Sequence, residues 1–358
     1  MHPSLFIQHD FSLLKFNTFG IDVAAKAFLS VTDPAMLCQV RQDSQLAVLP
    51  RLILGGGSNL VLTRDFSGLV LHMANKGITV VERNAHTISI RAAAGESWHG
   101  LVQWTLAHGF GGLENLSLIP GSVGASPIQN IGAYGVEAGS LIEAVRYYDF
   151  ETNAVLTLNH AECAFGYRDS VFKHRLRNSA VILDVTFGLP VCWQAQVQYG
   201  ELQQELQAMH RTLVAPSSNS TGDLAVIAPT DPIMISEAII AIRSRKLPDP
   251  AVTGNAGSFF KNPLVSADYR QQLIAQWPGL VSFEQADGNY KLAAGWLIEQ
   301  CGWKGRVMGA AGVYEKQSLV LINRGNVTGI DILRLADAIR QDVVGRFGVT
   351  LEPEPVIM

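Results

Sequence analysis

The sequence predicts an α+β fold, and three observations support this prediction. Short runs rich in aliphatic and β-branched residues, each bounded by turn-forming residues, dominate the first half of the chain. Stretches with the apolar spacing of helices are interleaved with these runs. The 33 glycines of this 358-residue chain are clustered, which indicates loops in which the backbone itself lines a binding site. Strands and helices mixed in this way are typical of α+β proteins.

The first half contains the clearest strands. Five apolar runs are expected to form them: residues 46–59, 68–73, 77–82, 86–95 and 180–189. Two other segments, 33–42 and 98–110, have helical spacing, and the second ends near glycine. We therefore expect a mixed domain of strands and helices over roughly residues 16–190.

The second half is expected to form a second α/β domain. Four segments have helical patterns: residues 233–246, 267–276, 293–301 and 329–347. Pro248 and Pro250 end the first of these helices, because proline cannot continue a helix. Residues 318–325 are expected to form a strand. The small polar residues 214–223 predict an exposed loop without a chemical role, inside a surface insertion over 209–226.

The composition excludes several classes of protein. With 48% hydrophobic and 16% charged residues the chain is a compact globular protein, and its net charge of −4 argues against a general nucleic-acid binder. No apolar run reaches transmembrane length and no signal peptide is evident, so we expect a cytoplasmic protein that does not contact a membrane. An anionic ligand would have to be met by local cations, for which the candidates are Arg168, Lys173, Lys246, Lys261 and Lys304.

The cysteines do not indicate a metal site. They lie far apart and form no C-x-x-C pair, so neither zinc nor a catalytic dithiol is expected. We expect reduced and mostly buried thiols at Cys38, Cys163, Cys192 and Cys301.

Two glycine loops predict a bound dinucleotide. The first, residues 54–59 (LGGGSN), follows an apolar run, where successive N–H groups form a concavity suited to phosphate; a simple glycine turn is the alternative. It is not a Rossmann fingerprint, because Leu60 stands where the third glycine belongs. The second loop, residues 120–135 (PGSVGASPIQNIGAYG), holds four glycines and the amides of Gln129 and Asn130, which suit the edge of a heteroaromatic ring. A long Ω-loop is its alternative interpretation.

Residues 254–263 (GNAGSFFKNP) offer a hydroxyl, Ser258, among small residues, followed by Lys261 and Asn262. The surroundings of Ser258 are not the G-x-S-x-G elbow of a nucleophile, so this serine is better suited to give or position a proton. A glycine turn with a solvated serine would be the preferred interpretation if the segment stood alone.

Seven motifs, taken in order, carry a resemblance to a known family. They are residues 16–22 (FNTFGID), 55–59, 120–135, 165–173 (FGYRDSVFK), 246–250 (KLPDP), 254–263 and 351–354 (LEPE). Over nearly its whole length the chain resembles the UDP-N-acetylenolpyruvoylglucosamine reductases, flavoenzymes of bacterial peptidoglycan precursor synthesis. The resemblance implies an FAD-binding domain of the vanillyl-alcohol-oxidase type and a C-terminal substrate-binding domain. It also implies that NADPH reduces FAD, and that hydride then passes to the enolpyruvyl group of a UDP-sugar.

The resemblance divides the chain into four parts. Residues 1–190 would be the FAD-binding domain, with two subdomains that meet near residue 75. Residues 191–246 would connect the domains and carry a tyrosine loop, which marks one subtype of the family. Residues 247–348 would bind the substrate, and residues 349–358 would return to the active site. We expect a monomer.

The motif matches also imply individual site residues. The catalytic residues would be Arg168, the proton donor Ser258 and Glu354. The first glycine loop would hold the pyrophosphate of FAD through Gly55, Gly56, Gly57, Ser58 and Asn59. The second would line the rest of the cofactor through Pro120, Gly121, Ser122, Gly124, Ser126, Gln129, Asn130, Gly132 and Ala133. The UDP-sugar would contact Tyr199, Lys246, Asn262, Lys304 and Gln317.

The sequence departs from the family pattern near its last glutamate. Pro355 follows Glu354, and an arginine common downstream in the family is missing, so Glu352 is an alternative for the active-site carboxylate. Two other functions are weighed: a flavin oxidase of the same superfamily acting on a sugar or alcohol, and a flavin- or nucleotide-binding regulator without catalysis. The joint presence of Arg168, Ser258 and a terminal glutamate argues against the regulator. The motifs at 246–250 and 254–263 argue against the oxidase.

Overall fold

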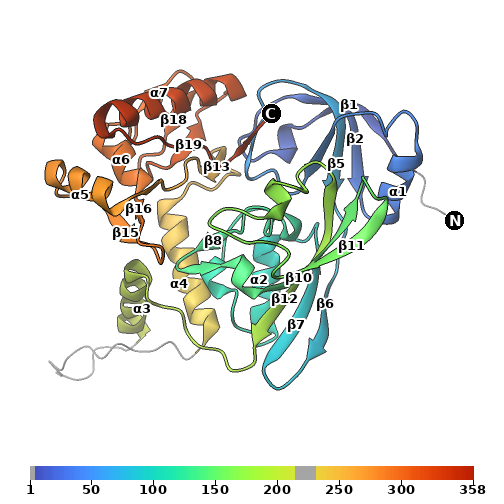
Figure 1. Cartoon of the computed structure of the whole chain (residues 1–358), viewed down its shortest axis with the longest axis horizontal. Helices are drawn as coiled ribbons and strands as arrows, with labels where there is room; N and C mark the ends of the chain where they lie inside the picture. Colours follow the sequence, from blue (N-terminus) through green and yellow to red (C-terminus); the bar gives the residue numbers. More distant parts are fainter. Residues whose placement is uncertain (1–4, 214–230) are drawn as a thin grey trace. The chain divides into compact units, whose positions relative to one another are not determined.

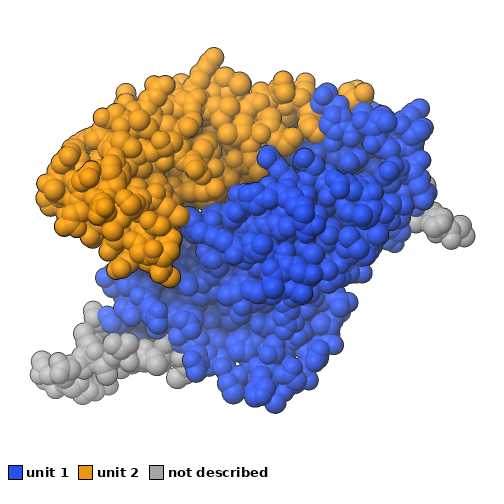
Figure 2. Space-filling model, in the orientation of Figure 1, with its two compact units in different colours: residues 1–9, 27–56, 67–243 blue, residues 10–26, 57–66, 244–358 orange. Residues whose placement is uncertain are grey.

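The computed structural model describes residues 5–213 and 231–358, which divide into two compact units (Figure 2). Unit 1 comprises residues up to 9, residues 27–56, and the described part of 67–243. Unit 2 is built from three separate segments, 10–26, 57–66 and 244–358. The four-part division expected from the sequence remains a prediction.

Unit 1 combines strands and helices (Figure 1). Its strands, two of which begin in residues of unit 2, are β2 (Ala24–Val31), β3 (Arg51–Leu54), β5 (Phe66–Met73), β6 (Ile78–Arg83), β7 (Thr87–Ala93), β8 (Gly132–Ala133), β9 (Val136–Glu137), β10 (Ile142–Asp149), β11 (Ala154–Asn159) and β12 (Ala180–Pro190). Its helices are α1 (Ala35–Gln42), α2 (Trp98–Ala107), α3 (Gly200–Leu213) and α4 (Pro232–Lys246), whose last residues belong to unit 2. Five strands form an antiparallel sheet in the order β11-β10-β12-β7-β6.

The core of unit 1 joins α2 to this sheet. Trp98 is completely buried, its ring contacts Phe187 of β12 at 5.7 Å between centroids, and its indole N–H donates to the Leu116 carbonyl at 2.9 Å. A tryptophan at the first position of a helix therefore anchors both the helix and the chain that follows it. The strands and helices expected for this half of the sequence are confirmed.

Helix α3 was not expected from the sequence. The connecting segment was predicted to be a loop from residue 209 onward, but the helix continues to Leu213. Its buried Leu202 and Leu206, four residues apart, pack with Ile235, Ile239 and Ile242 of α4 in a small core of their own. The predicted loop over 214–223 lies outside the described residues.

Unit 2 is a mixture of helices and mostly antiparallel strands, with β20 pairing with β4 in parallel. Its strands are β1 (Gln8–Ser12, of which residues 10–12 lie in this unit), β4 (Leu60–Val61), β13 (Asn255–Ser258), β14 (Leu264–Val265), β15 (Ser282–Glu284), β16 (Tyr290–Leu292), β17 (Val307–Met308), β18 (Ala311–Val313), β19 (Val320–Asn323) and β20 (Val356–Ile357). Its helices are α5 (Ala267–Gln276), α6 (Ala294–Gln300) and α7 (Gly329–Phe347). Strand β13 pairs with β19, which continues to β18 and β17. The four helices predicted for the second half of the chain are confirmed.

The motif at residues 16–22 is a structural clamp within unit 2. The Asn17 side chain is buried; its amide donates to the carbonyls of Leu13 and Ile21 at 2.8 and 2.9 Å, and its oxygen accepts from the Ile21 N–H at 2.9 Å. An apolar side chain at this position could not close the turn, because the Leu13 and Ile21 carbonyls and the Ile21 N–H would lose these hydrogen bonds.

The four cysteines differ from expectation in their exposure. All four are free thiols, as expected, but only Cys163 is buried; Cys38 and Cys301 are partly exposed and Cys192 is exposed. Burial raises the pKa of Cys163 to about 12, so this thiol remains protonated at neutral pH.

Candidate functional site

In unit 1 the two predicted glycine loops contact each other directly. A Cβ at Gly55 would lie 2.2 Å from the Ser122 hydroxyl oxygen, and one at Gly56 would lie 2.9 Å from the Gly121 Cα. Separations this short are not compatible with a side chain. These two glycines are therefore required for the loops to pack together.

The second loop is fixed to unit 1 through its backbone. The Trp98 N–H donates to the Gly121 carbonyl at 3.0 Å, and the Gly124 N–H donates to the Ala94 carbonyl at 2.9 Å. The completely buried Ser126 donates its hydroxyl to the Val123 carbonyl at 2.7 Å, which stabilises the turn. The loop is a preformed surface, since its shape is set by the protein.

Asn130 is the centre of a hydrogen-bond network in unit 1. Its side-chain amide donates to Glu137 Oε2 at 2.8 Å and to the Gly166 carbonyl at 3.0 Å, and its oxygen accepts from the Gly139 N–H at 2.7 Å. The sequence had predicted that this amide would face a ligand ring. The side chain instead holds the loop to the segment that carries Arg168.

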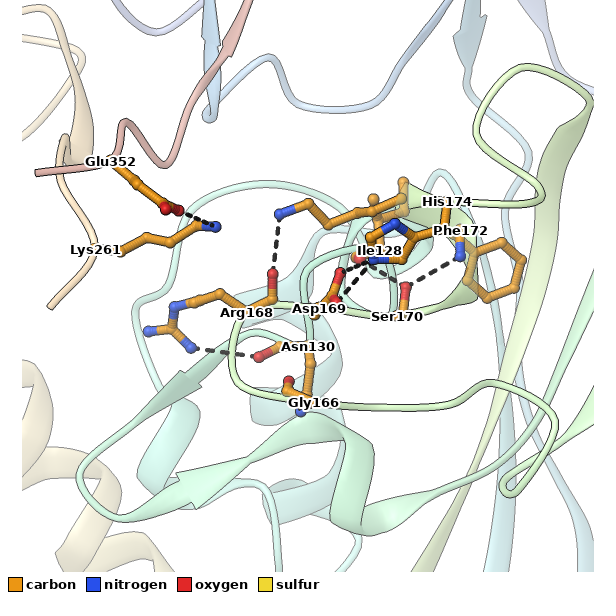
Figure 3. Close-up of polar contacts among 11 residues, drawn as sticks. Ile128, Asn130, Gly166, Arg168, Asp169, Ser170, Phe172, His174, Lys261 and Glu352 are labelled. Carbon is orange, nitrogen blue, oxygen red and sulfur yellow. Dashed lines mark hydrogen bonds and ion pairs between the residues drawn. The ribbon is translucent and has the colours of Figure 1, made fainter. Parts of the chain in front are cut away.

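Arg168 contacts the same loop from the other side. Its Nη1 donates to the Asn130 carbonyl at 3.3 Å and its Nη2 donates to the Gly132 carbonyl at 2.9 Å, while Lys173 Nζ donates to the Arg168 carbonyl at 2.9 Å (Figure 3). Neighbouring Asp169 pairs with His174, at 2.8 Å between Oδ2 and Nε2. Burial alone would raise the pKa of Asp169, but the hydrogen bond from His174 contributes to holding this pKa below its usual value.

Several residues around this loop have strained backbones. Non-glycine residues rarely adopt positive φ, and such residues are found preferentially at functional sites. Four of those in this part of unit 1 are Leu118 (φ 57°), Asn130 (φ 42°), Tyr134 (φ 48°) and Arg168 (φ 55°). The concentration of this strain supports a functional role for the loop.

The loop is suited to a large planar cofactor such as FAD. Its anchoring residues Ser122, Ser126 and Asn130 are buried, whereas Pro120 and Ile128 are exposed and Gln129 is partly exposed. The polar side chains that fix the loop are therefore buried, and backbone and apolar atoms are exposed. A flat ring system can bind against such a surface.

In unit 2 the segment 254–263 begins with strand β13 (Asn255–Ser258), and the residues that follow it are held on both sides by backbone hydrogen bonds. On one side, the Phe259 N–H donates to the Leu319 carbonyl at 2.7 Å. On the other, the Glu354 N–H donates to the Phe259 carbonyl at 2.8 Å. Phe259 and Phe260 are buried, whereas Ser258 is exposed. The predicted proton donor therefore lies on a rigid strand with its hydroxyl accessible.

The two glutamates near the C-terminus have different surroundings. Glu352 Oε2 lies 3.5 Å from Lys261 Nζ, and the Glu352 side chain is 73% exposed (Figure 3). Glu354 instead lies opposite Phe259, the residue directly after Ser258. The backbone of Glu354 is thus fixed to the residue after Ser258, whereas the carbonyl of Glu352 accepts from the Lys261 N–H at 3.0 Å.

The end of the first glycine loop supports the same region of unit 2. Gly57 has φ 61°, and a Cβ there would lie 2.0 Å from the Phe16 carbonyl oxygen. The Val356 N–H donates to the Asn59 carbonyl at 3.0 Å, and the Asn59 side chain donates to the Glu354 carbonyl at 3.4 Å. Asn59 therefore helps to fix the segment that carries Glu354.

Three of the predicted substrate residues have structural contacts in unit 2. Asn262 Oδ1 accepts from the Ala294 N–H at 2.9 Å, at the start of α6. Gln317 Oε1 accepts from the Leu319 N–H at 3.3 Å, and Lys304 pairs with Glu299 at 2.9 Å. Lys246 is the last residue of α4.

Two residues of unit 1 near the remaining predicted substrate residue, Tyr199, were not singled out in the sequence. The Tyr134 ring meets the Tyr199 ring edge-on, with centroids 5.4 Å apart, and the Arg243 side chain is hydrogen-bonded to Tyr134. Burial raises the pKa of Tyr134, so its phenol stays protonated. Tyr134 belongs to the second glycine loop and could have been found there, but nothing in the sequence distinguishes Arg243 from other helical arginines.

The described residues offer neither a metal-binding group nor a membrane-spanning helix. Within residues 5–213 and 231–358 there is no group of three or more histidine, cysteine, aspartate or glutamate side chains that could hold a metal ion. None of the helices in these ranges is long and apolar enough to cross a membrane.

Comparisons with known proteins agree on one family. The model for an FAD binding domain matches residues 25–155, and the model for the UDP-N-acetylenolpyruvoylglucosamine reductase C-terminal domain matches residues 249–358. Two relatives named UDP-N-acetylenolpyruvoylglucosamine reductase, from Ralstonia nicotianae and Paraburkholderia phymatum, are each 50% identical to this chain. The first alignment covers 97% of this chain and 98% of the relative, and the second covers 98% and 97%.

A solved structure supports the fold. The crystal structure of UDP-N-acetylenolpyruvylglucosamine reductase from Thermus caldophilus superposes with a TM-score of 0.63 at 21% identity, and covers 99% of this chain and 98% of that one. Together with the two family models, it confirms the predicted combination of an FAD-binding domain with a C-terminal domain.

Proposed function

The chain belongs to the UDP-N-acetylenolpyruvoylglucosamine reductase family, and from this we propose how its own residues carry out the reaction. It is an FAD-dependent oxidoreductase of peptidoglycan precursor synthesis. NADPH is the reductant in our proposal, and the product is UDP-N-acetylmuramate. The observation that supports the mechanism is the backbone hydrogen bond from the Glu354 N–H to the Phe259 carbonyl, which holds the segment of Glu354 beside the residue that follows Ser258.

FAD held by the two glycine loops would supply the hydride chemistry that links NADPH to the substrate. The hydride adds to the terminal carbon of the enolpyruvyl double bond, so that the electron pair of this bond moves to the neighbouring carbon and into the carboxylate. In our proposal Ser258 donates its proton to that neighbouring carbon, completing the addition of two hydrogens. A serine hydroxyl is a weak acid, but a carbanion-like centre is basic enough to accept its proton.

The charge that develops on the substrate needs donors around it. We infer that Glu354 is protonated or hydrogen-bonded in the complex and stabilises the enolic carboxylate, because an ionised carboxylate would repel it. Arg168 contributes a planar, positively charged guanidinium, whose fork of donors suits a carboxylate. Its two hydrogen bonds to loop carbonyls keep it in a fixed orientation, which lowers the cost of reorganisation during the reaction.

The remaining assignments are proposals from the motif matches. Tyr199, Lys246, Asn262, Lys304 and Gln317 would bind the UDP-sugar, and the two glycine loops would bind FAD. The negative net charge supports a small-molecule role without nucleic acid. We also propose that the protein acts as a monomer in the cytoplasm and without a membrane partner.

The first prediction separates the two halves of the reaction. In the Ser258→Ala variant, anaerobic stopped-flow absorbance should show reduction of the flavin by NADPH at the wild-type rate. Reoxidation of the reduced flavin by the enolpyruvyl UDP-sugar should slow by a factor on the order of 10² to 10⁴, the usual contribution of a positioned proton donor. Ser258→Cys, which retains a proton donor, should recover part of the rate.

The same assay tests the choice of carboxylate. Glu354→Gln should slow reoxidation strongly, whereas Glu352→Gln, at the exposed residue paired with Lys261, should behave like the wild type. Normal reoxidation in Ser258→Ala would exclude its role as proton donor. A protein that purifies without flavin would contradict the whole assignment, and oxidation of sugars by O₂ without NADPH turnover would favour the oxidase.

A further inference from the structure

Arg243 of α4 is a partly buried cation that the reaction described above does not use. Its Nε is buried and has no hydrogen-bond partner in the protein. Its side chain is hydrogen-bonded to Tyr134, a neutral phenol. Buried polar atoms are almost always paired, so an unpaired guanidinium nitrogen requires an explanation.

The charge of Arg243 is also uncompensated. Among the described residues of unit 1, no carboxylate pairs with it, and the phenol of Tyr134 is its only favourable partner. The nearby His99 is itself a base, and burial together with the charge of Arg243 lowers its pKa. Isolated buried charges are costly and are normally paired with an opposite charge, either from the protein or from a ligand.

The position of Arg243 indicates where that opposite charge would be. Its partner Tyr134 directly follows Gly132 and Ala133, which we propose to line the cofactor. Tyr134 is held in a left-handed conformation, with φ 48°, and its ring contacts that of Tyr199. Arg243 therefore lies at the end of the 120–135 loop, next to the tyrosine proposed to close over the substrate.

We propose that Arg243 is an anion-binding residue, and that its guanidinium receives a negatively charged oxygen of a ligand bound at the 120–135 loop. The inference rests on the proposed function of this loop. Two ligands carry such an oxygen: the flavin, whose pyrimidine edge gains negative charge on reduction, and the diphosphate of the UDP-sugar. A planar guanidinium that cannot lose its proton suits either one.

The test replaces Arg243 with methionine, which has a similar length and no charge. Arg243→Lys, which keeps the charge, and Arg245→Met, two residues further along α4, are the matched controls. On the FAD-loaded proteins we would measure the midpoint potential of the flavin by anaerobic titration against a reference dye. The dissociation constant of UDP-N-acetylmuramate on the oxidised enzyme would be measured by the change in flavin absorbance.

The two ligands predict different results. If the oxygen belongs to the flavin, Arg243→Met should weaken binding of reduced relative to oxidised FAD at least tenfold, a fall of about 30 mV or more in the two-electron potential. If it belongs to the diphosphate, the potential should be unchanged and the dissociation constant should rise at least tenfold. In either case the affected quantity, potential or dissociation constant, should change less in Arg243→Lys than in Arg243→Met. Both quantities should equal the wild-type values in Arg245→Met.

An Arg243→Met protein with wild-type potential and wild-type affinity would overturn the proposal. The same result follows if Arg245→Met shows equal changes, because the effect would then not be specific to Arg243. These outcomes leave the proposed reductase activity unaffected, since the wild-type protein would still be reduced by NADPH and reoxidised by the UDP-sugar. If Arg243→Met does not fold, Arg243→Lys and Arg243→Gln give the same comparison at smaller structural cost.

Discussion

Single glycines in this chain differ in what makes them necessary. Gly57 and Gly309 have the same φ of 61°, so an L-residue would pay the same conformational cost at both. The space around them differs completely. A Cβ at Gly57 would lie 2.0 Å from the Phe16 carbonyl oxygen, whereas a Cβ at Gly309 would meet no atom within 4 Å.

This contrast gives a prediction for unit 2. Gly309→Ala should reduce the free energy of unfolding by about 1–2 kcal/mol, the cost of the left-handed conformation alone. Gly57→Ala should cost clearly more, because the clash is with backbone and the turn at residues 16–22 must move. Urea denaturation of the two variants measures this difference, and equal losses would show that the turn adapts without cost.

His72 of β5 makes stability depend on pH. Burial, and to a lesser extent Lys76, lower its pKa below the usual value of a histidine. The folded protein therefore binds fewer protons here than the unfolded chain, and its stability falls as pH drops below about 6.5, the unfolded pKa. His72→Phe keeps a ring against Phe28, so between pH 7 and pH 5 its unfolding free energy should decline less steeply than that of the wild type.

Denaturation curves at several pH values provide this test. The remaining pH dependence of His72→Phe should include a part from His99, whose pKa is lowered too. Parallel curves for His72→Phe and wild type would mean that His72 is protonated equally well in the folded and unfolded states.

At the scale of elements, α7 is the best-defined helix in the sequence. Thr328 accepts from the Asp331 N–H, and the Asp331 carboxylate accepts from the Thr328 N–H at 3.1 Å, which forms a capping box. Gly348 ends the helix in a left-handed conformation. With both ends specified by local chemistry, the sequence predicted residues 329–347 as the helix, and the structure has the same bounds.

The cap of α7 provides a quantitative prediction. Thr328→Ala should reduce the free energy of unfolding by about 1 kcal/mol, since the N-terminal N–H groups of the helix lose their acceptor. Asp337→Ala is the control on the same helix: it removes an exposed i,i+3 pair with Arg340, which is worth at most a few tenths of a kcal/mol. If both variants lost equal stability in thermal denaturation, the cap would have no special role.

Other elements could not be predicted because tertiary contacts decide them. Leu202 and Leu206 carry the spacing of α3, but the helix is polar elsewhere and its packing partners lie beyond residue 231. The amide of Asn130 was expected to face a ligand, yet its three partners come from segments up to 36 residues away. Arg243 has no sequence signal at all, because burial next to Tyr134 is a property of the assembled unit. The motifs identify residues such as Asn130, but the contacts of these residues depend on segments that are distant in the sequence.

At the scale of the whole molecule, the chain segments of unit 2 depend on one another. Gly254 packs on the Phe19 carbonyl, Gly329 packs on the Leu62 carbonyl, and the Thr18 hydroxyl donates to the Asn255 carbonyl at 2.6 Å. The family model for the C-terminal domain starts at residue 249 and therefore omits both N-terminal segments. These two segments supply contacts that residues 244–358 cannot replace.

We therefore predict that residues 244–358 do not fold in isolation. Expressed alone, this fragment should show no cooperative thermal transition by circular dichroism. The same fragment joined by glycine-serine linkers to residues 10–26 and 57–66 should regain one. A cooperative transition in the fragment alone would show that residues 244–358 fold independently of the N-terminal segments.

Because unit 2 is built from segments far apart in the sequence, its folding is delayed while the chain is synthesised. Once residues 57–66 leave the ribosome, about 180 further residues must be made before their partners begin to appear. At 5–20 residues per second this is a wait of roughly 10 to 35 s. During that time the early segments cannot reach their final contacts, although the first parts of unit 1 are already available to fold. Each new molecule therefore passes through a half-finished stage in which chaperones or proteases have the longest opportunity to act.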